Sequence, residues 1–218
     1  MQKINKSEKL CYLCGKPGAD TKDHIPPRGI FPKELKGQLI TVAAHKSCNE
    51  MYSADDELFR NVTIMASHRS PEGLKAWNEQ VVSSWKKNKG ARLALISRVL
   101  PAWMRDPLGR MTRREALTLE ESVVRREVDR WTRGLFYHRF KEPFPSDIPV
   151  QVEKLQPPEI SLKSLDKIMI SNGVVPSWIH VEPGVFSYLF GPAHDDKHTM
   201  IALFVFFNTE VYMGATKV

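Results

Sequence analysis

Three cysteines and one histidine near the start of the chain have the spacing of metal ligands. Cys11 and Cys14 are three positions apart, and His45 and Cys48 repeat that interval. Each short segment can present two ligands to one ion, and thiolate sulfur with imidazole nitrogen suits tetrahedral Zn²⁺. Because the protein would fill all four positions, we expect this zinc to stabilise the fold and not to act as a Lewis acid. The alternative is that the four residues are inert core or surface groups.

Asp23, His24 and Asn49 could form a second, oxygen-rich site beside the zinc. Carboxylate and amide oxygens suit a hard divalent ion such as Mg²⁺ or Mn²⁺, with water and phosphate oxygens completing its coordination. His24 has a pKa near neutrality and is the natural general base for a water molecule. These three residues are therefore the candidates for catalysis.

Together these clusters resemble the HNH endonuclease family in its zinc-containing treble-clef form. The resemblance rests on C-x-x-C-G at 11–15, D-H-x-P-P at 23–27 and H-x-x-C-N at 45–49, and it covers residues 9–60. It implies a ββα-metal unit in which His24 activates water for attack on a DNA phosphodiester. It also implies that Asp23 and Asn49 hold the catalytic Mg²⁺ or Mn²⁺.

Two positions depart from the family pattern. The family's middle asparagine, which braces the long loop, corresponds to Ile40, so the brace is absent or comes from Thr41 or Gln38. Asn49 stands where histidine is common, a replacement that the family often shows. A chain without the brace could keep the fold and lack the activity. The alternative function is therefore a non-catalytic zinc-binding module that binds nucleic acid or a protein partner.

The elements around these residues should form the strand, loop, strand and helix of such a unit. Pro26 and Pro27 exclude a helix after the strand of Asp23 and His24. Residues 39–42 favour a second strand. A helix is expected over 46–67 from its apolar spacing. Its first turn would carry Asn49, facing the first strand.

Basic charge is concentrated in the middle of the chain. The net charge is +7, and residues 60–141 hold 18 lysines and arginines against 8 acidic residues, whereas residues 142–218 hold 5 against 9. Such a block favours a polyanion, so DNA is the expected partner; the alternative is that these cations only decorate solvated helix faces. The expected contacts are Lys86 and Lys87 at one helix end and a basic helix face made of Arg125, Arg126, Arg130 and Arg133.

Composition and periodicity indicate an α+β protein with three regions: a nuclease-like motif at 1–68, a basic helical region at 69–142, and an acidic α+β region at 143–218 with antiparallel strands. The middle region should contain helices at 70–88, 91–100 and 118–137, with a strand or loop at 108–117. The last region follows a proline-rich break at 143–149. We expect strands there at 150–155, 178–181, 185–190, 199–207 and 211–216 and a helix at 162–171. Whether this region binds a protein partner or an activating ligand is open.

Several classes of protein are excluded by composition. The chain has no apolar run of about 18 residues, so a membrane span is not expected. The first residues lack the apolar segment of a signal peptide. Cysteines in a zinc-like arrangement fit a reducing cytoplasm better than a disulfide framework. Histidines and aspartates at 194–198 invite a second metal site, but a polar hairpin turn is the preferred interpretation.

Overall fold

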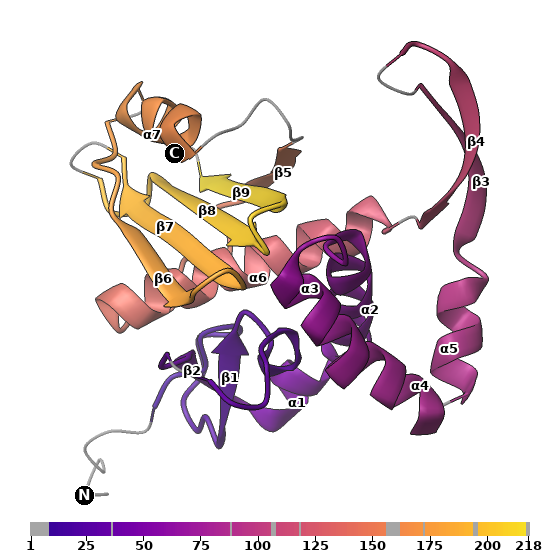
Figure 1. Ribbon diagram of the computed structural model, residues 1–218. Helices are drawn as coiled ribbons and strands as arrows, with labels where there is room; N and C mark the ends of the chain where they lie inside the picture. The colour runs from indigo at the N-terminus through magenta and orange to yellow at the C-terminus, as the bar shows by residue number, and fades with distance from the viewer. Residues whose placement is uncertain are drawn as a thin grey trace, which may run out of the picture.

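The computed structural model describes residues 9–35, 37–87, 89–105, 108–117, 119–155, 162–171, 173–193 and 196–216. One long helix, α6 (Glu121–Phe140), lies between an N-terminal two-stranded unit and a five-stranded C-terminal sheet (Figure 1). The mixture of helices with a small antiparallel sheet is as expected. Among the helices described, none has the length and apolar character needed to cross a bilayer.

The N-terminal unit has two strands and two short helices. Strands β1 (Thr21–Ile25) and β2 (Ile40–Ala44) pair antiparallel, and a loop with one 3-10 turn, η1 (Arg28–Ile30), joins them. The helix expected over 46–67 is divided into α1 (Lys46–Glu50) and α2 (Ser53–Ala66). The break at Met51 and Tyr52 allows the Tyr52 ring to lie 4.6 Å from the guanidinium of Arg130.

The expected helix over 70–88 is present, with a π-helical turn in its middle. Its parts are α3 (Pro71–Ala76), η2 (Trp77–Val82) and α4 (Ser83–Lys87). Ser70 caps its start, because its hydroxyl accepts a hydrogen bond from the N–H of Gly73 at 3.0 Å. The rings of Trp77 and Trp85 meet edge to face at 5.1 Å, as part of the core.

The middle region contains a strand hairpin as well as helices, where the sequence predicted a helix to residue 100 and a strand or loop at 108–117. Helix α5 (Lys89–Ile96) ends before residue 100, and β3 (Val99–Arg105) pairs antiparallel with β4 (Met111–Leu117). Pro101 is tolerated because both strands of an isolated hairpin have open edges, so the missing N–H costs no ladder bond. Gly109 turns the chain with a φ of 81°.

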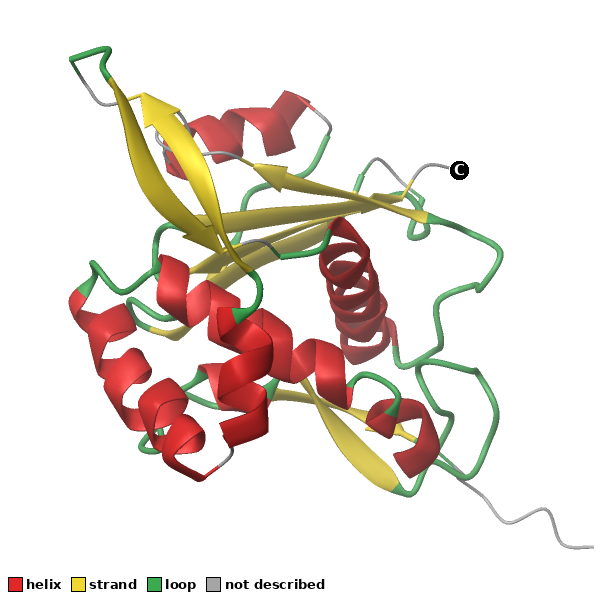
Figure 2. Ribbon diagram, turned by 90° about the vertical axis from the view of Figure 1, so that its right-hand side faces the viewer, coloured by secondary structure: helices red, strands yellow, loops and turns green. Residues whose placement is uncertain are grey.

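The C-terminal sheet has the order β5-β9-β8-β7-β6 and is antiparallel throughout. In Figures 1 and 2, α6 and α7 (Leu162–Ser171) lie on opposite faces of it. Phe204 and Phe206 pack in the cluster on the α6 side, and Leu203 and Val205 in the cluster on the α7 side. This explains the apolar run of β8. The strands are β5 (Val150–Leu155), β6 (Trp178–Glu182), β7 (Phe186–Pro192), β8 (Met200–Phe206) and β9 (Glu210–Thr216).

Two residues of the group at 194–198, His194 and Asp195, lie outside the described residues.

One hydrophobic core joins the three regions of the chain. Phe59 of α2 contacts Trp131 of α6, with ring centroids 4.8 Å apart. The same ring lies 5.6 Å from Phe206 and 5.2 Å from Tyr212 of the C-terminal sheet. The three regions therefore share this core, and a second buried cluster between the sheet and α7 lies within the C-terminal region.

Candidate functional site

Cys11, Cys14, His45 and Cys48 form one cluster that could hold a metal ion such as zinc. Their ligand atoms all lie within 4.8 Å of one another. The Nδ1 atom of His45 is 3.3 Å from the Sγ atom of Cys14 and 3.9 Å from that of Cys48. Such separations are expected of four ligands around one ion at Zn–N and Zn–S distances of about 2.0–2.3 Å. The donor set therefore fits zinc.

The backbone around the cluster orients its ligands. Gly15, with a φ of 71°, lets the chain turn back after the first ligand pair. The Nε2 atom of His45 lies 3.0 Å from the carbonyl oxygen of Pro17, which leaves Nδ1 to face the sulfur atoms. The N–H of Lys46 donates to the carboxylate of Asp20 at 2.8 Å and fixes the start of α1. Such outer contacts are typical of a built metal site.

The thiols of the cluster differ in acidity. A hydrogen bond with the backbone at Lys16 lowers the pKa of Cys14, whereas burial and the neighbouring thiols raise the pKa of Cys48 to about 11. A bound cation would relieve the repulsion between thiolates. Metal binding should therefore release protons.

A cavity of about 440 Å³ opens between β1, the long loop and helices α1 and α2. Asp23 and His24 of β1 and Asn49 of α1 all line this cavity. The structure thus brings together the three residues that the sequence indicated. Because Asn49 directly follows Cys48, one short helix supplies both a ligand of the metal cluster and an amide of the cavity.

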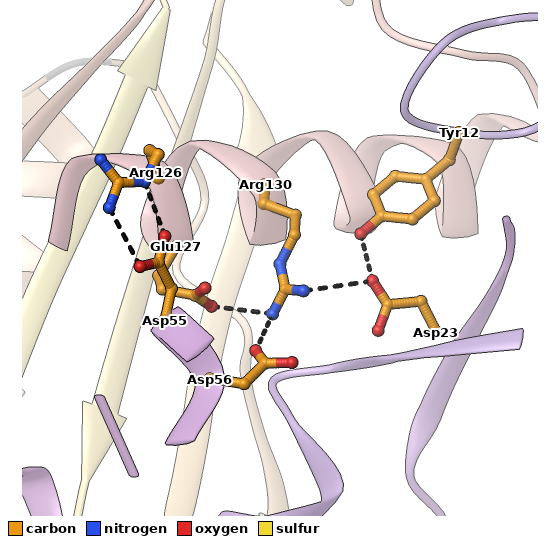
Figure 3. Close-up of polar contacts among 7 residues, drawn as sticks. All are labelled: Tyr12, Asp23, Asp55, Asp56, Arg126, Glu127 and Arg130. Carbon is orange, nitrogen blue, oxygen red and sulfur yellow. Dashed lines mark hydrogen bonds and ion pairs between the residues drawn. The ribbon is translucent and has the colours of Figure 1, made fainter. Parts of the chain in front are cut away.

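Asp23 is almost completely buried, with 4% of its surface exposed, and it already has partners. The hydroxyl of Tyr12 donates to Oδ2 of Asp23 at 2.5 Å, and Nη1 of Arg130 lies 3.6 Å from the same oxygen (Figure 3). Burial, with the charge of Asp23, raises the pKa of Tyr12 well above its usual value, so the phenol remains a donor. Tyr12 directly follows Cys11 and so links the cysteine cluster to this carboxylate.

Arg130 is the centre of a buried ionic cluster (Figure 3). One of its nitrogens donates both to Asp56 and, at 2.7 Å, to Glu127. One guanidinium thus faces three carboxyl groups, including Asp23. Burial raises the pKa of Glu127 to about 9 and that of Asp56 above its ordinary value. Burial thus favours the neutral form of these two acids, which limits repulsion within the cluster.

His24 lies half-buried on the strand next to Asp23, and neighbouring strand residues point to opposite faces. Burial lowers the pKa of His24, and the charges of Arg28 and Lys22 act in the same direction against that of Asp23. The imidazole is therefore neutral at pH 7 and able to accept a proton.

The long loop is braced by residues other than those expected. Arg28 donates to the carbonyl groups of Phe31 and Lys33 in the loop, at 3.1 and 3.0 Å. The side-chain amide of Gln80 in η2 donates to the same Phe31 carbonyl at 2.6 Å. Ile40, at the position of the family's asparagine, is buried in β2 as part of the hydrophobic core. From the sequence, the brace was expected to be absent or to come from Thr41 or Gln38, whereas these hydrogen bonds to the loop come from Arg28 and Gln80.

Besides Glu50, the sequence-based reasoning missed three charged residues of the cavity: Arg28, Glu57 and Arg60. Burial lowers the pKa of Arg60, and its guanidinium donates to the side chain of Asn61 at 3.0 and 3.1 Å. A signal was present, because positions 49, 53, 57 and 60 recur at helical spacing. Following that face beyond Asn49 would have found two of the three.

The basic face expected on α6 is largely neutralised. Arg130 is wholly buried, which contradicts its expected place on an exposed surface. The other three arginines are each paired with a carboxylate, because acids lie one turn earlier on α6 or on α2 beside it. The pairs are Arg125 with Glu121, Arg126 with Asp55, and Arg133 with Asp129.

Of the two lysines expected to contact DNA, Lys86 is exposed on α4, and Lys87 ends that helix.

No family model, no curated protein and no solved structure that was compared with the chain matches it. Its function is therefore argued from the residues of the site.

Proposed function

We propose that the protein is a metal-dependent nuclease of the HNH type that hydrolyses phosphodiester bonds in DNA. The observation that supports this most is the meeting of Asp23, His24 and Asn49 at one cavity. A cysteine and histidine cluster that suits zinc adjoins them in sequence. The order of strand, loop, strand and short helix is also that of a ββα-metal unit, so a treble-clef zinc motif is part of the proposal.

In this proposal His24 accepts the proton of the attacking water, because burial keeps the imidazole neutral near pH 7. Asp23 and Asn49 would hold a Mg²⁺ or Mn²⁺ ion, which would stabilise the charge that develops on the phosphate and the leaving oxygen. Arg28 and Arg60, on the wall of the same cavity, would bind phosphate oxygens. The zinc would hold strand and helix together.

The charges of the cavity support a divalent ion. Glu50, Asp56 and Glu57 join Asp23 on its wall, so acids outnumber the two arginines. The contact between Arg130 and Asp23, at 3.6 Å, is longer than a hydrogen bond. A divalent ion would therefore compete with a weak partner for this carboxylate.

Cleavage of supercoiled plasmid by the purified protein tests the proposal, with Mg²⁺, Mn²⁺, Ni²⁺ or EDTA added. We expect metal-dependent nicking that falls by about 10²-fold or more in His24→Ala, since a general base contributes roughly that much. Zinc content and the circular dichroism spectrum should not change. His68→Ala is the matched control, because His68 is exposed and its Nδ1 contacts only a carbonyl of its own helix in the described residues. Undiminished cleavage by His24→Ala would refute the assigned mechanism.

A second candidate is a non-catalytic zinc-binding module for nucleic acid or a protein partner. The observation in its favour is that Asp23 is buried and already accepts a hydrogen bond from Tyr12. Absence of cleavage with every metal, together with intact zinc and salt-sensitive DNA binding, would favour this module over the nuclease.

A further inference from the structure

The β3–β4 hairpin is an arm that extends from the body of the protein. It lies between the end of α5 and the start of α6, and both ribbon views show it projecting away from the rest (Figures 1 and 2). Within the described residues its two strands pair only with each other. Leu100, Trp103 and Met111 along these strands are all exposed.

The arm combines large apolar side chains with arginines. Trp103 is 68% exposed, and Leu108 at the turn is 77% exposed, an unusual cost for a surface segment. The register places Trp103 opposite Arg113 and Arg105 opposite Met111. Cross-strand partners and alternate residues share a face, so all four of these side chains lie on one side of the ribbon. That side presents apolar and cationic groups in alternation.

The charge of the arm points to a polyanion. The arm, residues 99–117, contains four arginines and two acidic residues. Arg105 and Arg113 are exposed, and no ion pair within the described part of the chain engages either of them. Arg125, Arg126 and Arg133 of α6, by contrast, are each paired with a carboxylate. Arg105 and Arg113 are therefore open to an anionic partner, whereas these three arginines of α6 are not.

We propose that the β3–β4 arm enters a groove of duplex DNA. A two-stranded ribbon has the width that the major groove admits. Arg105 and Arg113 would contact phosphates along the groove, and the exposed Trp103, Leu108 and Met111 would pack against sugars and base edges. This inference rests on the proposed function, because DNA is taken as the partner.

The base of the arm lies one helix away from the candidate catalytic cavity. Arg98, which precedes β3, pairs with Glu120 before α6 at 2.5 Å. Both line a second cavity, against α2. Glu57 of α2 lines this second cavity as well as the one that contains His24. DNA held by the arm would therefore be gripped close to the proposed cleavage site.

Binding of a labelled mixed-sequence duplex to the full chain tests the arm, measured by anisotropy over a range of KCl without added divalent ion. We compare the wild type, R105Q/R113Q and the charge-matched control K75Q/K167Q, whose lysines are exposed on α3 and α7. Loss of two phosphate contacts should make the slope of log K against log salt shallower by about 1.8 and weaken binding on the order of tenfold. Arm and control variants with the same slope would overturn the inference.

Trp103 provides a second readout that does not depend on charge. The difference in fluorescence between the wild type and Trp103→Phe gives the emission of this exposed ring. Bound duplex should reduce the quenching of that emission by acrylamide. Equal quenching with and without DNA would contradict the inference. A second contradictory result would be a concentration-dependent dimer, seen by sedimentation, that Trp103→Ala abolishes while the affinity for DNA is unchanged.

The two proposals fail in different ways. If cleavage requires His24 but the arm variants bind DNA as tightly as the wild type does, the nuclease proposal stands and the arm proposal is refuted. If DNA binding requires the arm but no metal supports cleavage, the arm proposal stands and the nuclease proposal is refuted.

Discussion

Tyr12 connects the cysteine cluster with the candidate catalytic cavity. It follows the ligand Cys11, its backbone N–H donates to Ala43 of β2 at 3.0 Å, and its hydroxyl donates to Asp23. A single buried residue thus ties the metal-binding turn to both strands. The position of Asp23 depends on the turn that the zinc would hold.

Tyr12→Phe tests this connection. The variant leaves a buried carboxylate without its donor, so we expect the free energy of unfolding to fall by about 1–3 kcal/mol. Zinc content should be unchanged, because no ligand is altered. Urea unfolding measures the first quantity and metal analysis the second. Tyr137→Phe is the control, since that ring packs against Tyr12 and is only partly buried; equal losses in both variants would argue against the hydrogen bond.

At the scale of elements, α6 organises the molecule. It contacts β1 and β2 on one side and β5 and β9 on the other. Close approach is possible because Gly134 faces Ile25, where a Cβ would lie 2.7 Å from the isoleucine side chain. Gly214 of β9 similarly faces Thr132. Between these contacts Arg130 joins α6 to α2 and β1 through Asp56 and Asp23.

Arg130→Met should be strongly destabilising. It removes the only guanidinium of the buried cluster and leaves three carboxyl groups to repel one another, which typically costs about 3–5 kcal/mol. Arg125→Met is the matched control on the same helix, because its pair with Glu121 is exposed and such pairs contribute about 0–1 kcal/mol. Chemical denaturation of both variants measures the difference. Similar values would mean that the buried cluster contributes no more than a surface pair.

The elements that could be predicted from sequence are those with local signals. The four ligands of the cluster come from two short segments with the same spacing, and β8 is a continuous apolar run. The states of Arg126 and Arg130 could not be predicted from the spacing on α6, because they depend on acids far away in the chain. Asp55 pairs with Arg126 across 71 positions. For the arm, the sequence allowed a strand or loop at 108–117 but did not predict β3 as its partner, because an isolated hairpin shows little apolar alternation.

At the scale of the whole molecule, the metal cluster belongs to the shared core. Cys11 and Tyr12 are in the same buried cluster as Trp131 and Phe204, although the sequence places them in different regions. Loss of the ion would free the turn that carries Tyr12. Because the core is continuous, that disturbance should reach the C-terminal sheet and not remain in the N-terminal unit.

Cys48→Ala should therefore lower the stability of the entire chain. Removing one of four ligands should reduce zinc from one ion per chain to almost none and lower the unfolding midpoint by at least about 10 °C, since each 1 kcal/mol lost lowers it by about 2–4 °C in a chain of this length. Calorimetry and metal analysis measure both effects. Cys48→His is the control, because two cysteines and two histidines still suit zinc. We expect one transition in every variant; a separate low-temperature transition in Cys48→Ala would show that the N-terminal unit melts alone, and an unchanged midpoint after zinc loss would show that the ion does not stabilise the core.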